Sequence, residues 1–93
     1  MSITRINECQ AAEGKAEELF EFLNSLVPYI SSSEGCLGCE VLRNSESQGS
    51  FVVIEKWASI ECHKKSIDNF PREEMQAAMS LFGAPPKGAY YHA

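Results

Sequence analysis

The chain has 93 residues, of which 44% are hydrophobic and 23% charged, a composition that fits one small globular domain spanning residues 1–93. Its net charge of −5 and the absence of any lysine or arginine run argue against a nucleic-acid partner. No apolar run approaches the ~20 residues of a membrane span, and the N-terminus lacks a charged-then-apolar signal region. We therefore expect a cytoplasmic protein that binds neither nucleic acid nor a membrane.

Residues 3–30 predict a strand followed by a helix. Residues 3–11 have the mixed polarity of a strand, which Gly14 and its charged neighbours interrupt. From residue 15 to residue 30 the apolar side chains recur at the spacing of one helical face. Pro28 lies inside this pattern, so we expect the helix to kink or end near that residue.

Residues 35–43 and 51–57 are two strand-like runs separated by a polar segment, which predicts a β-hairpin. The second run places Glu55 two residues before Trp57, the only tryptophan. The two-residue period of a strand puts both side chains on the same face. A hairpin centred near residues 46–49 would also place Glu40 opposite Glu55. A carboxylate beside an indole on an otherwise apolar strand is the feature that we expect to matter most for function.

The last third of the chain predicts two shorter helices and a final strand. Ser59 is a suitable N-cap for the first helix, and Pro71 suits the first turn of the second, which Gly83 ends. The expected inward-facing stripes are Ile60, His63, Ile67 and Phe70 on the first helix, and Met75, Ala78, Met79 and Phe82 on the second. Residues 88–92 have the composition of a short strand.

The resulting order, β-α-β-β-α-β with the second helical segment split at Pro71, predicts an α+β ferredoxin-like fold with an antiparallel sheet. Both helical segments would cover one face, and the first and third strands would be central. The other face would be bare and apolar, which implies a partner. We expect a homodimer that packs two sheets face to face.

The four cysteines, Cys9, Cys36, Cys39 and Cys62, raise the question of a redox or metal site. Cys36 and Cys39 have the Cys-x-x-Cys spacing, but residues three apart on a strand lie on opposite faces and roughly 10 Å apart. A disulfide needs Cα atoms within about 7 Å. No second ligand pair has a suitable spacing. We expect free, reduced cysteines and no metal.

Several segments occur together, in order: Gly14-Lys15 at the start of the first helix, residues 34–43 (EGCLGCEVLR), residues 51–57 (FVVIEKW) followed by Ser59 and Glu61, and residues 83–86 (GAPP) before an aromatic strand. With this order and length, nearly the whole chain resembles the antibiotic biosynthesis monooxygenase (ABM) domain family of the dimeric α/β-barrel superfamily. The resemblance implies an oxidoreductase that oxygenates aromatic polyketides or quinols without metal, flavin or any other cofactor. The deprotonated substrate supplies an electron to O₂, while the protein binds a flat apolar molecule and stabilises an anion.

The chain departs from this family on the second helix. Family members often carry a histidine about two turns after the Glu-x-Trp strand, but here that position is Ser66, and His63 lies one turn earlier. Haem-degrading relatives carry a tryptophan on this helix and a later histidine ligand. Trp57 is the only tryptophan of this chain, and no histidine occurs between His63 and His92, so we do not expect haem chemistry. Asn7 does match a first-strand asparagine of the haem-degrading branch.

The candidate catalytic residues are Glu55, His63 and Asn7. Glu55 in an apolar pocket would have a raised pKa and accept a proton from a phenol or anthrone; alternatively, it is a structural carboxylate held by backbone N–H groups, Arg5 or Arg43. His63 is either a base or hydrogen-bond donor at the pocket, or a satisfied, partly buried histidine. Asn7 would hydrogen-bond the anion or position O₂, although a partly exposed strand accounts for it equally well.

The candidate substrate-binding residues are Trp57, Phe51, Ser66 and Tyr90. Trp57 would stack on an aromatic ring, or else belong to the core or dimer interface. Tyr90 and Tyr91 alternate in the last strand, so one of them would reach the pocket or the neighbouring subunit. We expect Met75, Met79 and Phe82 to be core residues.

The sequence supports three functions and leaves open whether the protein is an enzyme. The resemblance favours a cofactor-independent monooxygenase acting on a quinol-like or polycyclic phenolic small molecule. The missing helix histidine favours a non-catalytic small-molecule-binding or stress-related dimeric domain. An isomerase of a small polar metabolite would need a wetter, cationic pocket, for which few arginines are available: Arg5, Arg43 and Arg72. The character of the pocket separates these alternatives.

Overall fold

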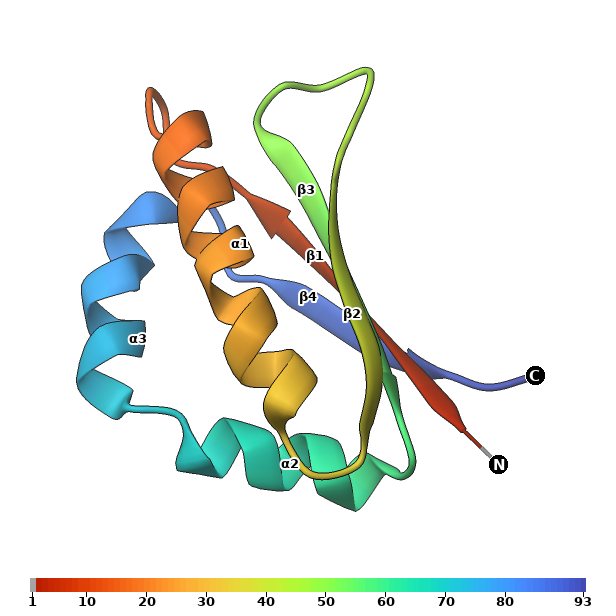
Figure 1. The fold of residues 1–93 in the computed structure, drawn as a ribbon. Helices are drawn as coiled ribbons and strands as arrows, with labels where there is room; N and C mark the ends of the chain where they lie inside the picture. Colours follow the sequence, from red (N-terminus) through yellow and green to blue (C-terminus); the bar gives the residue numbers. More distant parts are fainter. Residues whose placement is uncertain (1) are drawn as a thin grey trace.

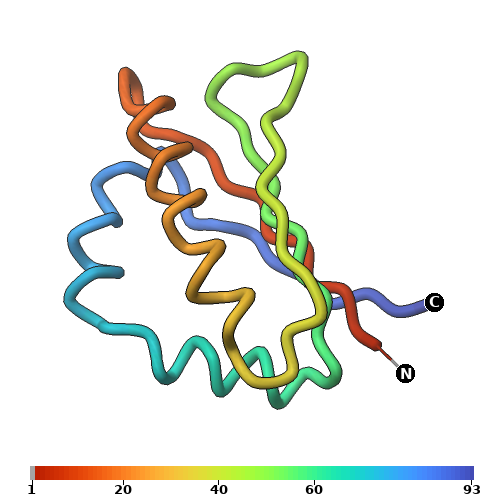
Figure 2. Tube along the Cα trace, viewed as in Figure 1, coloured from red at the N-terminus to blue at the C-terminus, as the bar shows by residue number. Residues whose placement is uncertain are grey.

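A computed structural model of the protein describes residues 2–93. Four strands, Ile3–Gln10 (β1), Cys36–Arg43 (β2), Ser50–Trp57 (β3) and Lys87–Tyr91 (β4), alternate with three helices, Ala16–Ser32 (α1), Ile60–Asn69 (α2) and Arg72–Ala78 (α3), and a 3₁₀ turn, Met79–Leu81 (η1). Figures 1 and 2 show the helices on one side of the twisted sheet. The predicted α+β ferredoxin-like fold is confirmed, with the second helical segment divided into α2 and α3.

The sheet is antiparallel, with the strand order β2-β3-β1-β4. The prediction that the first and third strands are central is therefore confirmed. In this register Arg5 of β1 lies between Glu55 of β3 and Tyr90 of β4, and Asn7 lies between Val53 and Gly88. Directly paired residues of antiparallel strands point to the same face, so the pairing brings these side chains into neighbouring positions.

Burial alternates along β3 because its two faces have different neighbours. Phe51, Val53, Glu55 and Trp57 are buried toward the helices. The core forms where this face meets α1, and its buried members are Cys9, Leu19, Leu23, Phe51 and Val53. Glu55 and Trp57 therefore face the helical layer of their own subunit, which the sequence alone did not decide.

No helix within the described residues 2–93 covers the opposite face of the sheet (Figure 1). Its apolar side chains come from all four strands: Ile6, Leu42, Val52, Ile54, Ala89 and Tyr91. Leu42 and Tyr91 are 46% and 52% exposed. The prediction of a bare, partly apolar sheet face is thus confirmed for the isolated chain.

A β-bulge at Leu37 changes the register of β2. Cys36 pairs with Trp57 and Cys39 pairs with Glu55, so both cysteines lie on the helix-covered face. The expectation that they lie on opposite faces is wrong because the bulge inserts one residue between them. Glu40 pairs with Ile54 on the uncovered face and does not oppose Glu55.

The helix starts were predicted better than the helix ends. Ser59 caps α2 by accepting a hydrogen bond from the Cys62 backbone N–H, as predicted. Pro28 does not end α1, which continues to Ser32; the proline is exposed, so its ring points away from the packed side. Pro71 precedes α3 as its N-cap residue instead of occupying the first turn.

The expected apolar stripes of α2 and α3 are only partly buried. Ile67, Met75 and Met79 are exposed, although we predicted that all three face the core. Ala78 is the only residue of α3 that is buried. Helical spacing identified one face of each helix, but Ile67 and Met75 on these faces line a cavity and so remain exposed. No helix within residues 2–93 is long and apolar enough to cross a bilayer.

Candidate active site

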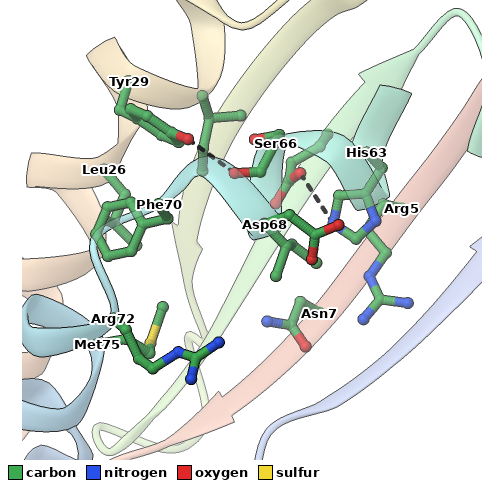
Figure 3. Close-up of a pocket in the computed structure, with 13 residues that line it drawn as sticks. Arg5, Asn7, Leu26, Tyr29, His63, Ser66, Asp68, Phe70, Arg72 and Met75 are labelled. Carbon is green, nitrogen blue, oxygen red and sulfur yellow. Dashed lines mark hydrogen bonds and ion pairs between the residues drawn. The ribbon is translucent and has the colours of Figure 1, made fainter. Parts of the chain in front are cut away.

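A cavity of about 580 Å³ lies between the helix-covered face of the sheet and the three helices. Its lining comes from both central strands and from all three helices: Arg5, Asn7, Leu26, Tyr29, Ile30, Glu55, His63, Ser66, Ile67, Asp68, Phe70, Arg72 and Met75. Figure 3 shows Leu26, Phe70 and Met75 at one side and His63 and Arg5 at the other, with Asn7 between them. The cavity thus has an apolar wall and a polar wall.

Glu55 is the most deeply placed acid of the polar wall, with 6% of its surface exposed. The indole Nε1–H of Trp57, two residues along β3, donates a hydrogen bond to Glu55 Oε1 at 2.8 Å. Burial raises the Glu55 pKa above its usual range, while this hydrogen bond and the charge of Arg5 oppose the rise. Trp57 therefore fixes the orientation of the carboxyl group and moderates its basicity.

His63 extends from α2 over Glu55 and is also 6% exposed. Its Nδ1 lies 2.6 Å from the Tyr90 hydroxyl, and its Nε2 lies 3.8 Å from Glu55 Oε1. Burial, and secondarily the charge of Arg5, lowers the His63 pKa to about 4, so the imidazole is neutral near pH 7. With the proton on Nε2, Tyr90 donates to Nδ1 and the Nε2–H points toward Glu55.

Arg5 and Asn7 project from β1 into the same part of the cavity (Figure 3). The Arg5 guanidinium carbon lies 4.8 Å from the centre of the Tyr90 ring. A stacking contact of this kind holds a guanidinium in place without neutralising it. Arg5, Tyr90, His63 and Glu55 therefore form one connected group across three strands and α2.

Ser66 holds the far end of α2 against α1. The Tyr29 hydroxyl donates to the Ser66 carbonyl oxygen at 2.7 Å, and the Ser66 and Ser33 hydroxyl oxygens are 3.3 Å apart. Tyr29 also packs edge-on against Phe70, with 5.2 Å between the ring centres. These contacts give the cavity a fixed back wall.

The structure brings together most of the residues that the sequence suggested. Glu55, His63, Asn7 and Ser66 line the cavity, and Tyr90 contacts His63 from behind. Trp57 and Phe51 do not line it.

Trp57 and Phe51, which we predicted as substrate contacts, are buried residues outside the cavity lining. Trp57 is fully buried next to Glu55 on the same face of β3, where it donates a hydrogen bond to that side chain. Phe51 packs against Phe20 in the core, with 5.5 Å between the ring centres. The alternative that Arg43 holds Glu55 is also wrong, because Arg43 pairs with Glu17 at 2.9 Å.

Sequence reasoning did not identify Tyr29 and Asp68 as lining residues. It named Arg5 and Arg72 only as cations for an isomerase pocket and Arg5 as a possible partner of Glu55, and both arginines line the cavity. The sequence could have predicted Arg5 as a lining residue, because it lies two residues before Asn7 and so shares its face of β1. Met75, expected in the core, lines the cavity. Within residues 2–93, His, Cys, Asp and Glu side chains form no group of three or more that is placed to hold a metal ion.

Known structures share this architecture. PA3566 from Pseudomonas aeruginosa superposes with a TM-score of 0.84 and 21% identity, covering 99% of this chain and 93% of that chain. The putative antibiotic biosynthesis monooxygenase from Nitrosomonas europaea gives a TM-score of 0.89 and 14% identity, covering 99% and 89%. A mutant of SnoaB, a cofactor-independent oxygenase from Streptomyces nogalater, gives a TM-score of 0.82 and 16% identity, covering 99% and 92%. At these identities the likeness concerns the fold alone.

Sequence comparison assigns the family. No curated protein matches the chain. The model of the antibiotic biosynthesis monooxygenase family, however, matches residues 2–80, which include both central strands, α1 and α2. The chain therefore belongs to the antibiotic biosynthesis monooxygenase family.

Proposed function

We propose that the protein is a cofactor-independent monooxygenase that acts on a quinol-like or polycyclic phenolic small molecule in this cavity. One observation carries the proposal. The buried carboxyl group of Glu55 faces a cavity with an apolar wall, and Trp57 donates a hydrogen bond to it. Membership of the family supports the proposal, as does the likeness to a protein described as a cofactor-independent oxygenase.

Glu55 is the proposed base. A carboxylate whose pKa is raised by burial is a better match to a phenol or an activated C–H group than an exposed carboxylate. For an anthrone-type substrate, Glu55 takes one proton from the ring CH₂ group, and the resulting anion passes one electron to O₂. Recombination forms a C–O bond to a peroxide. Loss of water with the second CH₂ hydrogen then leaves a ketone, so that CH₂ and O₂ become C=O and H₂O.

The neighbouring polar groups have separate proposed roles. Neutral His63 connects Glu55 with Tyr90 and provides a hydrogen bond near the reacting oxygen. Asn7, on the adjacent strand, donates to the substrate oxyanion. Leu26, Phe70 and Met75 pack on the flat ring system at the other side of the cavity.

We propose further that two copies associate through the uncovered sheet face. Ile6 and Ile54 are direct neighbours at the centre of this face, and the exposed Leu42 and Tyr91 extend it to both edge strands. Burial of an apolar sheet face against its own copy produces a symmetric dimer. The cavity lies on the other side of the sheet and stays accessible in such a dimer.

A second candidate function is isomerisation of a small polar metabolite. Two of the three arginines considered in the sequence, Arg5 and Arg72, line the cavity and are available to bind a polar substrate. Glu55 would then move a proton between two substrate carbons. This reaction does not consume O₂, which separates it from the first candidate.

The test is O₂ consumption by metal- and flavin-free protein with a panel of quinols and anthrones. Glu55→Gln keeps the shape of the side chain but removes the base, and we expect the rate to fall by about 10²-fold or more. Glu21→Gln, at an exposed position of α1, is the matched control and should keep the full rate. No rate above the uncatalysed reaction for any panel member would reject the oxygenase, and an unaffected Glu55→Gln variant would reject Glu55 as its base.

A further inference from the structure

Arg5 occupies a cradle that is built for its guanidinium group. The Arg5 guanidinium carbon lies 4.8 Å from the centre of the Tyr90 ring. The guanidinium group also lies against Gly88, at the position where any added Cβ atom would overlap it. Both residues belong to β4 and lie on the same face of it, two residues apart. Glycine is therefore required at position 88 for this placement of Arg5.

The Arg5 guanidinium in this cradle forms no ion pair within 4.0 Å with a carboxylate of residues 2–93, although its charge acts on Glu55 at longer range. Within the same residues, no hydrogen bond joins its side chain to another group. Arg43 differs in this respect because its fork contacts both oxygens of Glu17. A guanidinium offers five N–H donors. Those of Arg5 have only the cavity and solvent as a source of acceptors.

No other charged group among the described residues that line the cavity accepts a hydrogen bond from the Arg5 guanidinium. Glu55 lies beside Arg5 in the register, but its Oε1 accepts from Trp57 and faces His63. Asp68 and Arg72 are exposed residues of the cavity mouth, and neither forms an ion pair with Arg5. The amide of Asn7, two residues from Arg5 on the same face of β1, adds a further N–H donor.

We propose that Arg5, placed by Gly88 and Tyr90, binds a permanent carboxylate on the substrate, so that the substrate is an acidic aromatic molecule. This inference rests on the proposed function and narrows its substrate class. A planar guanidinium binds a planar carboxylate through two parallel hydrogen bonds. The carboxylate fixes one end of the ring system at Arg5 and Asn7, and the other end then lies along the apolar wall of Leu26, Phe70 and Met75.

The test compares two probes that differ only in the carboxylate: 1,4-dihydroxynaphthalene and 1,4-dihydroxy-2-naphthoate. Binding is measured anaerobically by isothermal titration calorimetry, so that no turnover occurs. We expect the naphthoate to bind the natural protein about 10- to 100-fold more tightly, as for a charge-assisted hydrogen-bonded pair. Arg5→Gln and Gly88→Ala should both abolish this preference while leaving the affinity for the neutral probe within about 3-fold.

Gly88→Ala is the sharper variant because it keeps Arg5 in the sequence and only displaces its side chain. Gly49→Ala is the matched control, since its added Cβ meets only Ala11 at an ordinary 4.0 Å, and it should keep the preference. Thermal unfolding of each variant checks that it is folded. Equal affinity of the natural protein for the two probes, or an unchanged preference in folded Gly88→Ala, overturns the proposal.

The same proteins also report on the proposed oxygenase, through O₂ uptake when air is admitted. Selective binding of the naphthoate without O₂ uptake supports the carboxylate site and rejects oxygenation of this probe. O₂ uptake that is equal for both probes and insensitive to Arg5→Gln supports the oxygenase and overturns the carboxylate site. The two proposals can therefore fail separately.

Discussion

Replacing His63 with glutamine should change how the stability of the protein depends on pH. In the folded protein, burial lowers the His63 pKa to about 4 from an ordinary value of 6.5. Between these two values the unfolded chain binds a proton on His63 and the folded chain does not. The free energy of unfolding therefore falls as the pH drops from 6.5 toward 4. Glutamine still provides a hydrogen-bonding partner for Tyr90 but does not titrate.

The size of this effect follows from the two pKa values. The contribution lost from the free energy of unfolding is about 2 kcal/mol at pH 5 and about 3 kcal/mol at pH 4, relative to pH 7.5. Glu55 titrates in an overlapping range and with the opposite sign, because its pKa is raised. Burial causes that rise, whereas the Trp57 hydrogen bond and the Arg5 charge oppose it, and His63→Gln removes neither of these two groups. The Glu55 contribution therefore cancels when the two proteins are compared.

The assay is urea unfolding from pH 7.5 to pH 4, monitored by the fluorescence of Trp57, which is fully buried in the folded state. Protein concentration is held constant, because a dimer has concentration-dependent stability. His92→Gln replaces the other histidine, which is exposed, and should behave like the natural protein. The natural protein should lose about 2 kcal/mol more than His63→Gln between pH 7.5 and pH 5. Parallel curves would refute the reasoning that His63 is buried in its neutral form.

Three further perturbations address the neighbouring features. Trp57→Phe removes the N–H donor of Glu55, so we expect the Glu55 pKa to rise further in ¹³C NMR titrations of labelled glutamate; an unmoved titration would contradict a role for the indole in stabilising the carboxylate. Ile54→Lys places a charge in the uncovered sheet face and should convert a dimer to monomers in sedimentation velocity. Met79→Lys, at an exposed position of η1, is the control and should leave a dimer intact. A dimer that survives Ile54→Lys would place the interface elsewhere. Ser59→Ala removes the cap of α2 and should lower the free energy of unfolding by about 1 kcal/mol in urea. No measurable change there would mean that water replaces the cap.

The arrangement of elements could be predicted from the sequence because its determinants are local. The alternation of residues 51–57 placed Glu55 and Trp57 on one face, and the observed hydrogen bond between them follows from that spacing. The Ser59 cap was recognisable from residue type and position alone. A first and a third strand at the centre of the sheet follow from the β-α-β-β-α-β order.

The predictions that were wrong also share a cause. Each concerned a feature that depends on contacts between distant segments of the chain. The bulge at Leu37 places Cys36 and Cys39 on the same face of the sheet, and no local pattern in residues 35–43 predicts this bulge. Met75 has the spacing of a core residue, yet α3 sits where the sheet no longer covers it, and its side chain faces the cavity. Residue spacing describes one element at a time, whereas burial depends on what lies opposite.

In the candidate site, too, local sequence patterns predicted some features and long-range contacts decided the others. The sequence by itself determined that a carboxylate, an indole and a histidine occur at positions that strand and helix periods direct to the interior. Only the tertiary structure decided that His63 lies against Tyr90, that Trp57 is buried beside Glu55 instead of lining the cavity, and that Gly88 makes room for Arg5. Strand period fixes the face of a side chain, but the pairing of β1 with β3 and β4 brings residues 5, 55, 88 and 90 together. That pairing is a long-range property, since these residues are separated by up to 85 positions in the chain.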